Sequence, residues 1–157
     1  MKNPNYWQEK KYNLANSKLP RCSAINYFPK INLVSTKITA RSDEFIPKYE
    51  NADSSFAFVM ACLEEEISLP PGGSALVSCG FSIQISKGYK AKISIFSDLA
   101  NKGLIIKDEF LDLDSSCKDE VKIYFLNTSD NLIKIYNKMK IAKIWAEQIF
   151  YFDWIDF

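Results

Sequence analysis

The side chains that could carry out chemistry in this 157-residue chain are carboxylates, lysines, hydroxyls and thiols, because the sequence contains no histidine. A catalytic dyad or triad that uses an imidazole base is therefore excluded. Two acidic groupings stand out, Glu64-Glu65-Glu66 and the Asp112-x-Asp114 pair. A short acidic run before a strand is typical of a solvated surface, and an Asp-x-Asp before a turn is typical of loop capping. Taken alone, these residues predict surface and turn positions.

The cysteines and the overall charge exclude several other classes of protein. Cys22, Cys62, Cys79 and Cys117 include no close pair, so we expect free thiols in a reducing compartment and no zinc site. Lys plus Arg (20) nearly balances Asp plus Glu (19), which gives no argument for binding nucleic acid or a membrane. The N-terminus lacks the apolar segment of a signal peptide. We expect a soluble, intracellular protein, in the cytoplasm or nucleus of the producing or host cell.

The elements that must position these side chains are strands. Apolar and polar residues alternate with period two over residues 81–86 and 89–95, which predicts strands with one buried face. Two shorter strands are expected at residues 67–69 and 75–77, with breaks at residues 70–73 and at Cys79-Gly80. Four short strands with no helix between them predict an antiparallel, all-β fold.

Further strands are expected at residues 31–38, 56–62, 121–127 and 132–136. The length predicts a single β domain over residues 31–157, preceded by an N-terminal extension or arm, residues 1–30. That segment either packs on the barrel or a neighbouring subunit, or binds a partner. The aromatic and acidic C-terminus, residues 150–157, is interpreted as an edge strand or a tail docked on another subunit. A short linear motif for a protein partner is the alternative.

One continuous stretch carries a family resemblance. The string LPPGGSALVSCGFSIQISKGYKAKI, followed by FSDLANKGL, resembles the central part of the trimeric dUTPases (dUTP diphosphatases). The resemblance runs from about residue 46 to residue 149. It implies a distorted jelly-roll or β-clip barrel with little helix, assembled as a homotrimer.

Two motifs of that family keep part of their polar residues here. Phe96-Ser97-Asp98-Leu99-Ala100 lies on the Arg-Ser-Gly-Leu-Ala motif, in which the Arg forks onto phosphate oxygens. The fourth motif, Gly-Asp-Arg-Ile-Ala-Gln-Leu, keeps its basic charge as Lys140, while Lys143 stands in place of its Gln. The resemblance thus implies a set of residual nucleotide-binding candidates: Ser97, Lys140, Lys143 and Tyr89.

The family's other motifs have lost more of their polar and glycine residues in this chain. Phe58 falls where the family's first motif has an Asp, and a phenyl ring offers a metal-bound water no acceptor, so we expect no metal-binding residue. Asp112 matches the water-activating Asp of the third motif and is the residual catalytic candidate. The Tyr expected after Asp114 is missing, and the turn over residues 115–119 is longer than in the family. The Gly-rich fifth motif is absent.

Because the substitutions fall on polar site positions while turn and core positions hold, the sequence favours a dUTPase-like pseudoenzyme. Such a protein would have lost nucleotide hydrolysis, would need no cofactor, and would bind an unidentified protein partner as a regulatory homotrimer; a viral or mobile-element origin is left open. The alternative is a divergent dUTP diphosphatase that hydrolyses dUTP to dUMP and pyrophosphate with Mg²⁺, using Asp112, Ser97 and Lys140. A dCTP deaminase is disfavoured because its Arg-Ser-Ser-x-Ala-Arg string is missing.

Overall fold

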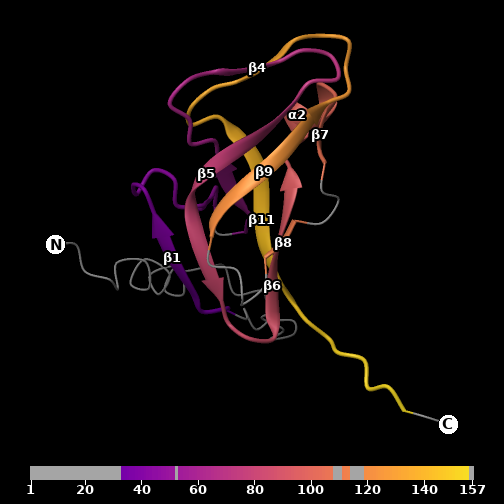
Figure 1. The fold of residues 1–157 in the computed structure, drawn as a ribbon. Helices are drawn as coiled ribbons and strands as arrows, with labels where there is room; N and C mark the ends of the chain where they lie inside the picture. The colour runs from indigo at the N-terminus through magenta and orange to yellow at the C-terminus, as the bar shows by residue number, and fades with distance from the viewer. Residues whose placement is uncertain (1–32, 52, 108–110, 114–118, 156–157) are drawn as a thin grey trace, which may run out of the picture. The chain divides into compact units, whose positions relative to one another are not determined.

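The structure is a computed structural model that describes residues 33–51, 53–107, 111–113 and 119–155, and for residues 111 and 112 it describes the backbone (Figure 1). The expectations for residues 1–30, Cys22, Cys117 and the turn after Asp114 lie outside the described residues. The elements in chain order are β1 (Thr36–Ala40), β2 (Lys48–Tyr49), β3 (Ala57–Met60), β4 (Ile67–Leu69), β5 (Ser74–Ile85), β6 (Tyr89–Ile95), α2 (Ser97–Asn101), β7 (Leu104–Ile106), β8 (Leu111–Leu113), β9 (Glu120–Asn127), β10 (Ile133–Ile135) and β11 (Lys140–Gln148).

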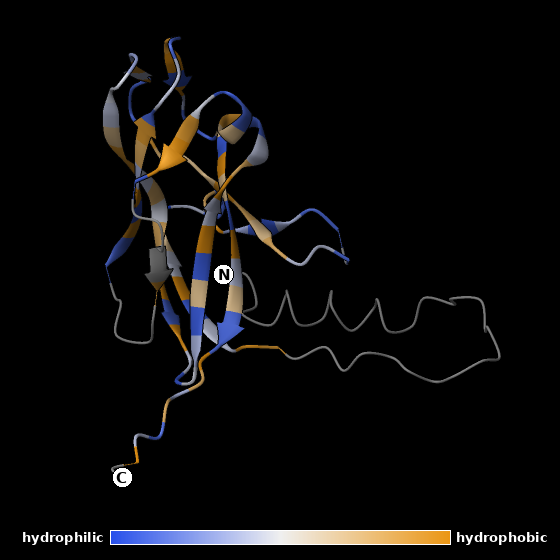
Figure 2. Cartoon of the chain, turned by 90° about the vertical axis from the view of Figure 1, so that its right-hand side faces the viewer, coloured by the Kyte–Doolittle hydropathy of each residue, from blue (hydrophilic) through white to orange (hydrophobic). Residues whose placement is uncertain are grey.

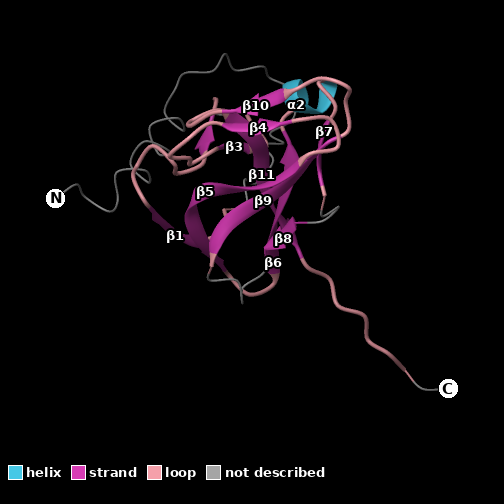
Figure 3. Cartoon of the chain, turned by 45° about the horizontal axis from the view of Figure 1, so that its top comes forward, coloured by secondary structure: helices cyan, strands magenta, loops and turns pink. Residues whose placement is uncertain are grey.

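The strands form two larger sheets and one small sheet. The larger sheets have the orders β1-β5-β9-β7 and β2-β3-β11-β6-β8, and β10 pairs with β4 in the small one. Each of these pairings is antiparallel. In the part of the chain that the structure describes, α2 is the one helix, and it lies beside β7 (Figure 3). The prediction of an antiparallel, all-β fold with little helix is confirmed.

The predicted break at Cys79-Gly80 is wrong, because β5 runs without interruption through it. The pairing of β5 with β9 shifts register between Ser78 and Ser82, which marks an irregularity in the ladder and not a strand end. Gly80 lies in this shift with φ +71°, a conformation that glycine adopts without steric cost. A Cβ there would lie 2.9 Å from Cys62 Sγ. The glycine therefore bends one long strand where the sequence suggested two short ones.

The first strand also differs from its prediction. Residues 31 and 32 lie outside the described part, and β1 begins at Thr36 and extends to Ala40. Its side chains up to Thr39 are exposed, because β1 is the edge strand of its sheet. Apolar alternation therefore located the strand but not its ends.

The core lies on the inner faces of the sheets, where alternate residues of each strand are buried. Along β9, Val121, Ile123 and Phe125 are buried while their neighbours are more exposed. The hydropathy alternates in the same way along the strands (Figure 2). Burying an aliphatic or aromatic side chain of this size contributes roughly 1.5–3 kcal/mol to the free energy of unfolding. The outward-facing residues are thus held in place by the buried neighbours that alternate with them.

Asn127, at the end of β9, links this strand by hydrogen bonds to β4 of the small sheet, and its side chain is fully buried. Its Nδ2 donates to the carbonyl oxygens of Leu69 at 2.9 Å and Asn131 at 2.8 Å. Its Oδ1 accepts from the backbone N of Ser129 at 3.0 Å and from Ser129 Oγ at 2.8 Å. One amide thereby satisfies polar groups from β4 and from the loop that follows β9.

Residues 149–155, which follow β11, have no regular secondary structure. The segment runs away from the sheets toward the C-terminus (Figure 1). Phe150, Phe152 and Trp154 are 84%, 82% and 84% exposed. No helix among the described residues is long and apolar enough to cross a membrane.

Candidate functional site

Three phenyl rings and two lysines meet on the five-stranded sheet, and we call Phe56, Phe58, Phe96, Lys140 and Lys143 the lysine–phenylalanine cluster. The ring centroids of Phe56 and Phe58 are 5.4 Å apart, as are those of Phe58 and Phe96. Both pairs are packed edge to face, the arrangement that aromatic quadrupoles favour. Segments far apart in the sequence thus build one aromatic floor.

Strand register explains why these side chains meet. Phe58 on β3 is paired with Lys143 on β11, and Lys143 is paired on its other side with Ser94 on β6. Paired residues point to the same face of a sheet, while their chain neighbours point to the other. The neighbours Ala57 and Val59 belong to the core cluster, whereas Phe58 is buried outside that cluster, against the rings of Phe56 and Phe96. Phe58 and Lys143 therefore occupy the face of the sheet that is turned away from the core.

Each lysine of the cluster is held against a ring. Lys140 Nζ lies 4.0 Å from the ring centroid of Phe58, and Lys143 Nζ lies 4.8 Å from that of Phe56 and 5.7 Å from that of Phe96. Lys143 Nζ also donates a hydrogen bond to Ser97 Oγ at 2.8 Å. A ring face attracts an ammonium group without neutralising it, so the positive charge remains available to an anion.

The structure brings together three of the five site residues that the sequence predicted, namely Ser97, Lys140 and Lys143. Tyr89 does not join them, because it begins β6 and is paired with Gln148, at the opposite end of β11. The length of β6 places Tyr89 about 20 Å from Phe96. Asp112 lies on β8, with its backbone paired to Lys92 on β6; its side chain lies outside the described part.

A hollow of about 390 Å³ adjoins the cluster. It is lined by Phe96, Asp98, Leu99, Lys102, Tyr136, Lys138, Met139 and Lys140. Three lysines face one aspartate in this lining. Lys138 forms an ion pair with Glu44 at 2.7 Å, and Lys140 lies at 3.7 Å from Glu50. The lining itself carries more lysines than carboxylates, and Glu44 and Glu50 beside it largely balance that charge through Lys138 and Lys140.

The described side chains of this site do not fit Mg²⁺. That ion takes oxygen ligands in near-octahedral geometry and is usually held by one or two carboxylates. Phe58 presents a ring where the family resemblance places a carboxylate, and two ammonium groups stand over the rings. Within residues 33–51, 53–107, 111–113 and 119–155, no group of three or more acidic, histidine or cysteine side chains could hold a metal ion.

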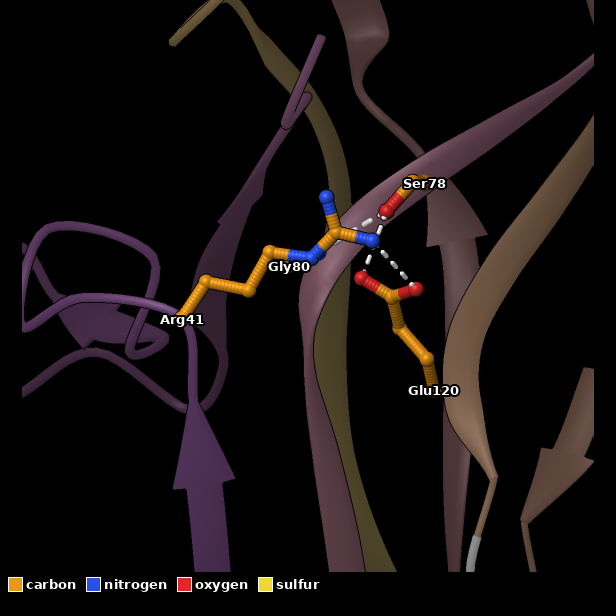
Figure 4. A network of polar contacts seen from close by, with 4 residues as sticks. All are labelled: Arg41, Ser78, Gly80 and Glu120. Carbon is orange, nitrogen blue, oxygen red and sulfur yellow. Dashed lines mark hydrogen bonds and ion pairs between the residues drawn. The ribbon is translucent and has the colours of Figure 1, made fainter.

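A second polar cluster lies on the other large sheet, where Arg41 reaches from the end of β1 across β5 to Glu120 on β9 (Figure 4). Arg41 Nη2 donates to Glu120 Oε2 at 2.9 Å, and Ser78 Oγ donates to Glu120 Oε1 at 2.7 Å. The amide of Gly80 donates to Ser78 Oγ at 3.3 Å. Because the two charges satisfy each other at the register shift of β5, this cluster is structural.

The pKa of the Glu120 carboxyl reflects this network. Partial burial by itself would raise the pKa, but hydrogen bonds from Ser78 and Arg41 and the positive charge of Arg41 outweigh burial, so the pKa is lowered from 4.5. The hydrogen bond and charge of Glu120 raise the pKa of Arg41 in turn. Both groups are therefore charged near neutral pH.

The sequence interpretation missed Phe56, Lys102 and Lys138. The sequence predicts a strand over residues 56–62, in which the spacing of Phe56 and Phe58 by one residue is a signal of a shared face, although β3 itself begins at Ala57. Lys138 adopts φ +64° in the turn before β11, and this conformation cannot be read from a lysine in the sequence. Lys102 directly follows α2 and lines the hollow. No motif in the sequence marks it, because only the folded chain brings it to this place.

Comparisons with known proteins agree with this architecture. The family model described as dUTPase matches residues 50–155. The deoxyuridine 5'-triphosphate nucleotidohydrolase of Chlamydia pneumoniae is 31% identical over 100 residues, which cover 63% of this chain and 69% of that protein. The enzyme of the same name from Rhizobium rhizogenes is 31% identical over 119 residues, which cover 74% of this chain and 75% of that protein.

Solved structures show the same fold at low sequence identity. The dUTPase from phage phi11 of Staphylococcus aureus matches with a TM-score of 0.67 and 14% identity, over 78% of this chain and 96% of that one. The dUTPase of Streptococcus mutans matches with a TM-score of 0.66 and 14% identity, over 75% of this chain and 98% of that one. A variant of the phi11 enzyme is described as showing the coordination of a structural Mg(II) ion. Because the family model covers about two thirds of the sequence and the relatives agree with it, this chain belongs to the dUTPase family.

Proposed function

We propose that this chain is a divergent dUTP diphosphatase that hydrolyses dUTP to dUMP and pyrophosphate. The observation that carries the proposal is the meeting of Ser97, Lys140 and Lys143 on one outer face, within a domain matched to relatives that bear the enzyme's name. The sequence alone favoured loss of hydrolysis. Family membership, the basic charge that Lys140 keeps at the fourth motif and the second cation that Lys143 adds beside it support the catalytic alternative instead.

The residues have distinct roles in this proposal. Lys143 and Ser97, already joined at 2.8 Å, would contact phosphate oxygens, and Lys140 would supply a second positive charge. Positioning and charge stabilisation dominate phosphoryl transfer, so these contacts matter most for the rate. Asp112 would activate the attacking water, a contribution of about 10²–10⁴ in rate.

The test is pyrophosphate release from dUTP, measured with dCTP and dTTP as competing substrates and with and without Mg²⁺. We expect turnover of dUTP that Asp112→Asn abolishes and that Lys143→Ala lowers by about tenfold or more. Lys107→Ala is the matched control, since Lys107 also stands over a ring, that of Tyr124 at 4.7 Å, but follows β7 of the other sheet. A purified, folded protein without dUTP turnover in either condition would contradict the proposal.

A second candidate function is a dUTPase-like protein that binds a protein partner and does not hydrolyse nucleotide. Two observations favour it: Phe58 and Phe96 occupy motif positions where the resemblance places an acid and an Arg, and the aromatic C-terminal segment is highly exposed. This candidate gains support if dUTP is not hydrolysed and removal of residues 150–157 abolishes binding of a defined partner. Removal of residues 1–28 tests the N-terminal arm in the same way.

We also propose a homotrimer built from the β domain, with residues 1–30 as an appended arm. Leu76 and Ile105 on the four-stranded sheet are 57% and 43% exposed, and the C-terminal aromatics add further apolar surface. Exposed apolar surface of this extent favours burial between subunits. Light scattering coupled to size exclusion should report three chains at micromolar concentration, whereas a monomer or a dimer would contradict this assembly.

A further inference from the structure

We infer that the lysine–phenylalanine cluster binds the phosphate chain of a nucleoside triphosphate as the free anion, with Lys140 and Lys143 supplying the charge that Mg²⁺ would otherwise supply. The inference rests on the proposed function for the choice of ligand. It concerns the form in which that ligand is bound. It goes beyond hydrolysis, because a protein that binds the metal-free anion need not turn it over.

The first support is the state of the two ammonium groups. In the part of the chain that the structure describes, no carboxylate lies within ion-pair distance of Lys143, and its polar contact is the neutral Ser97 Oγ. Lys140 has Glu50 at 3.7 Å, a long contact between exposed side chains. Such a surface pair contributes little and is easily exchanged for a stronger acceptor. Both positive charges are therefore available.

The second support is the floor beneath them. Phe58 is 8% exposed and presents its face to Lys140, while Phe56 and Phe96 flank Lys143. The rings fix the ammonium groups without cancelling their charge and remove water from one side of them. An anion at this place meets a charge in a medium less polar than bulk water, which strengthens the attraction.

The third support is that the side chains of the cluster offer no ligands for a metal ion. A Mg²⁺ ion bridging phosphate oxygens needs a carboxylate or a metal-bound water with an acceptor. Phe58 and Phe96 offer neither, and two fixed ammonium groups repel a divalent cation. Mg²⁺ that is chelated by the triphosphate lowers the negative charge that the lysines attract. Free Mg²⁺ should therefore compete with the site and not complete it.

The adjoining hollow extends the same charge pattern. Lys102 lines it together with Lys140 and Asp98, and Lys138, which also lines it, is paired with Glu44 at 2.7 Å. Its volume of about 390 Å³ gives room for more than one phosphate group beside the cluster. Lys102 thus adds a further positive charge in the hollow beside Lys140 and Lys143.

The experiment is isothermal titration calorimetry of the full chain with inorganic tripolyphosphate and with dUTP, each in EDTA and in excess Mg²⁺. We expect binding in EDTA that is weakened by Mg²⁺ and by salt. Lys140→Ala and Lys143→Ala should each weaken the affinity by about tenfold, a loss equivalent to one charge-assisted contact. Lys143→Arg should retain binding, and Lys107→Ala should leave it unchanged.

The outcomes separate this inference from the proposed function. Binding only in the presence of Mg²⁺, or no binding of either ligand, overturns the inference. The comparison of binding in EDTA with binding in Mg²⁺ uses the unaltered protein. It therefore remains valid even if one of the lysine variants fails to fold. Metal-free binding without pyrophosphate release leaves the inference standing and contradicts the proposed hydrolysis. Mg²⁺-dependent hydrolysis that is insensitive to Lys140→Ala and Lys143→Ala contradicts the inference and the roles proposed for these two lysines, but leaves the hydrolysis of dUTP standing.

Discussion

Replacing Asn127 with alanine should destabilise the domain more than any surface change in the same loop. The substitution removes two donated bonds, to the carbonyls of Leu69 and Asn131, and two accepted bonds from Ser129. Each such bond contributes about 1 kcal/mol net, but water can replace the partners on the exposed loop. The carbonyl of Leu69 belongs to a residue that is 2% exposed, and leaving it unpaired costs about 1–3 kcal/mol. We therefore expect Asn127→Ala to lower the free energy of unfolding by about 3 kcal/mol.

The matched control is Asn131→Ala, which removes the same side chain from an exposed position in the same loop. Asn131 accepts from Asn127 through its backbone carbonyl, so its own side chain is not needed for that bond. Urea unfolding at fixed protein concentration measures both variants, and thermal melting should show a loss of about 10 °C for Asn127→Ala. If the two variants lose the same small amount of stability, the buried amide does not hold the loop and the reasoning is refuted.

Three further predictions follow from the geometry of β5. Gly80→Ala should lower the free energy of unfolding by about 2 kcal/mol or more, because the added Cβ meets Cys62 and the positive φ is strained; an unchanged urea midpoint would contradict this. Because the pKa of Glu120 is lowered from 4.5, its ion pair with Arg41 stabilises the fold above that pH and is lost as the pH falls below it. The stability difference between wild type and Glu120→Gln should thus be present at pH 7 and vanish at the acid end of a titration; a difference that persists there would count against the network. Burial raises the pKa of Cys79, so mass-mapped alkylation of the native protein should leave this thiol unmodified, and rapid labelling would show that the core opens.

Period-two patterning predicted much of the fold because it reports which face of a strand is buried. Residues 81–85 and β6 alternate as expected, and their apolar members lie in the core or pack against it. The same signal failed at Cys79-Gly80, where a glycine was interpreted as a strand end. The structure shows that Gly80 has a positive φ and lies where the pairing of β5 with β9 shifts register. Which residues of β9 pair with β5 cannot be read from the sequence around Gly80 alone.

The candidate site was predictable in part for a similar reason. Ser97, Lys140 and Lys143 were located by motif resemblance, and the fold brings them together. The phenyl floor was not predicted, because Phe58 meets Lys143 only through the register of β3 on β11. Tyr89 lies away from the other candidates within this chain, because the length of β6 separates it from Phe96 and Ser97, and its role stays a prediction.

The substitutions at positions 58 and 96 also have a different meaning once their contact is known. By resemblance, Phe58 replaces an acid and Phe96 replaces an Arg, and the structure places the two rings 5.4 Å apart, edge to face. Because an acid and an Arg carry opposite charges, losing only one of them would change the net charge of the site by one unit. Losing both leaves the net charge of the site unchanged and gains a ring contact. The two substitutions therefore count as one coupled change and not as two independent losses, and Lys140 and Lys143 place positive charge over the resulting rings.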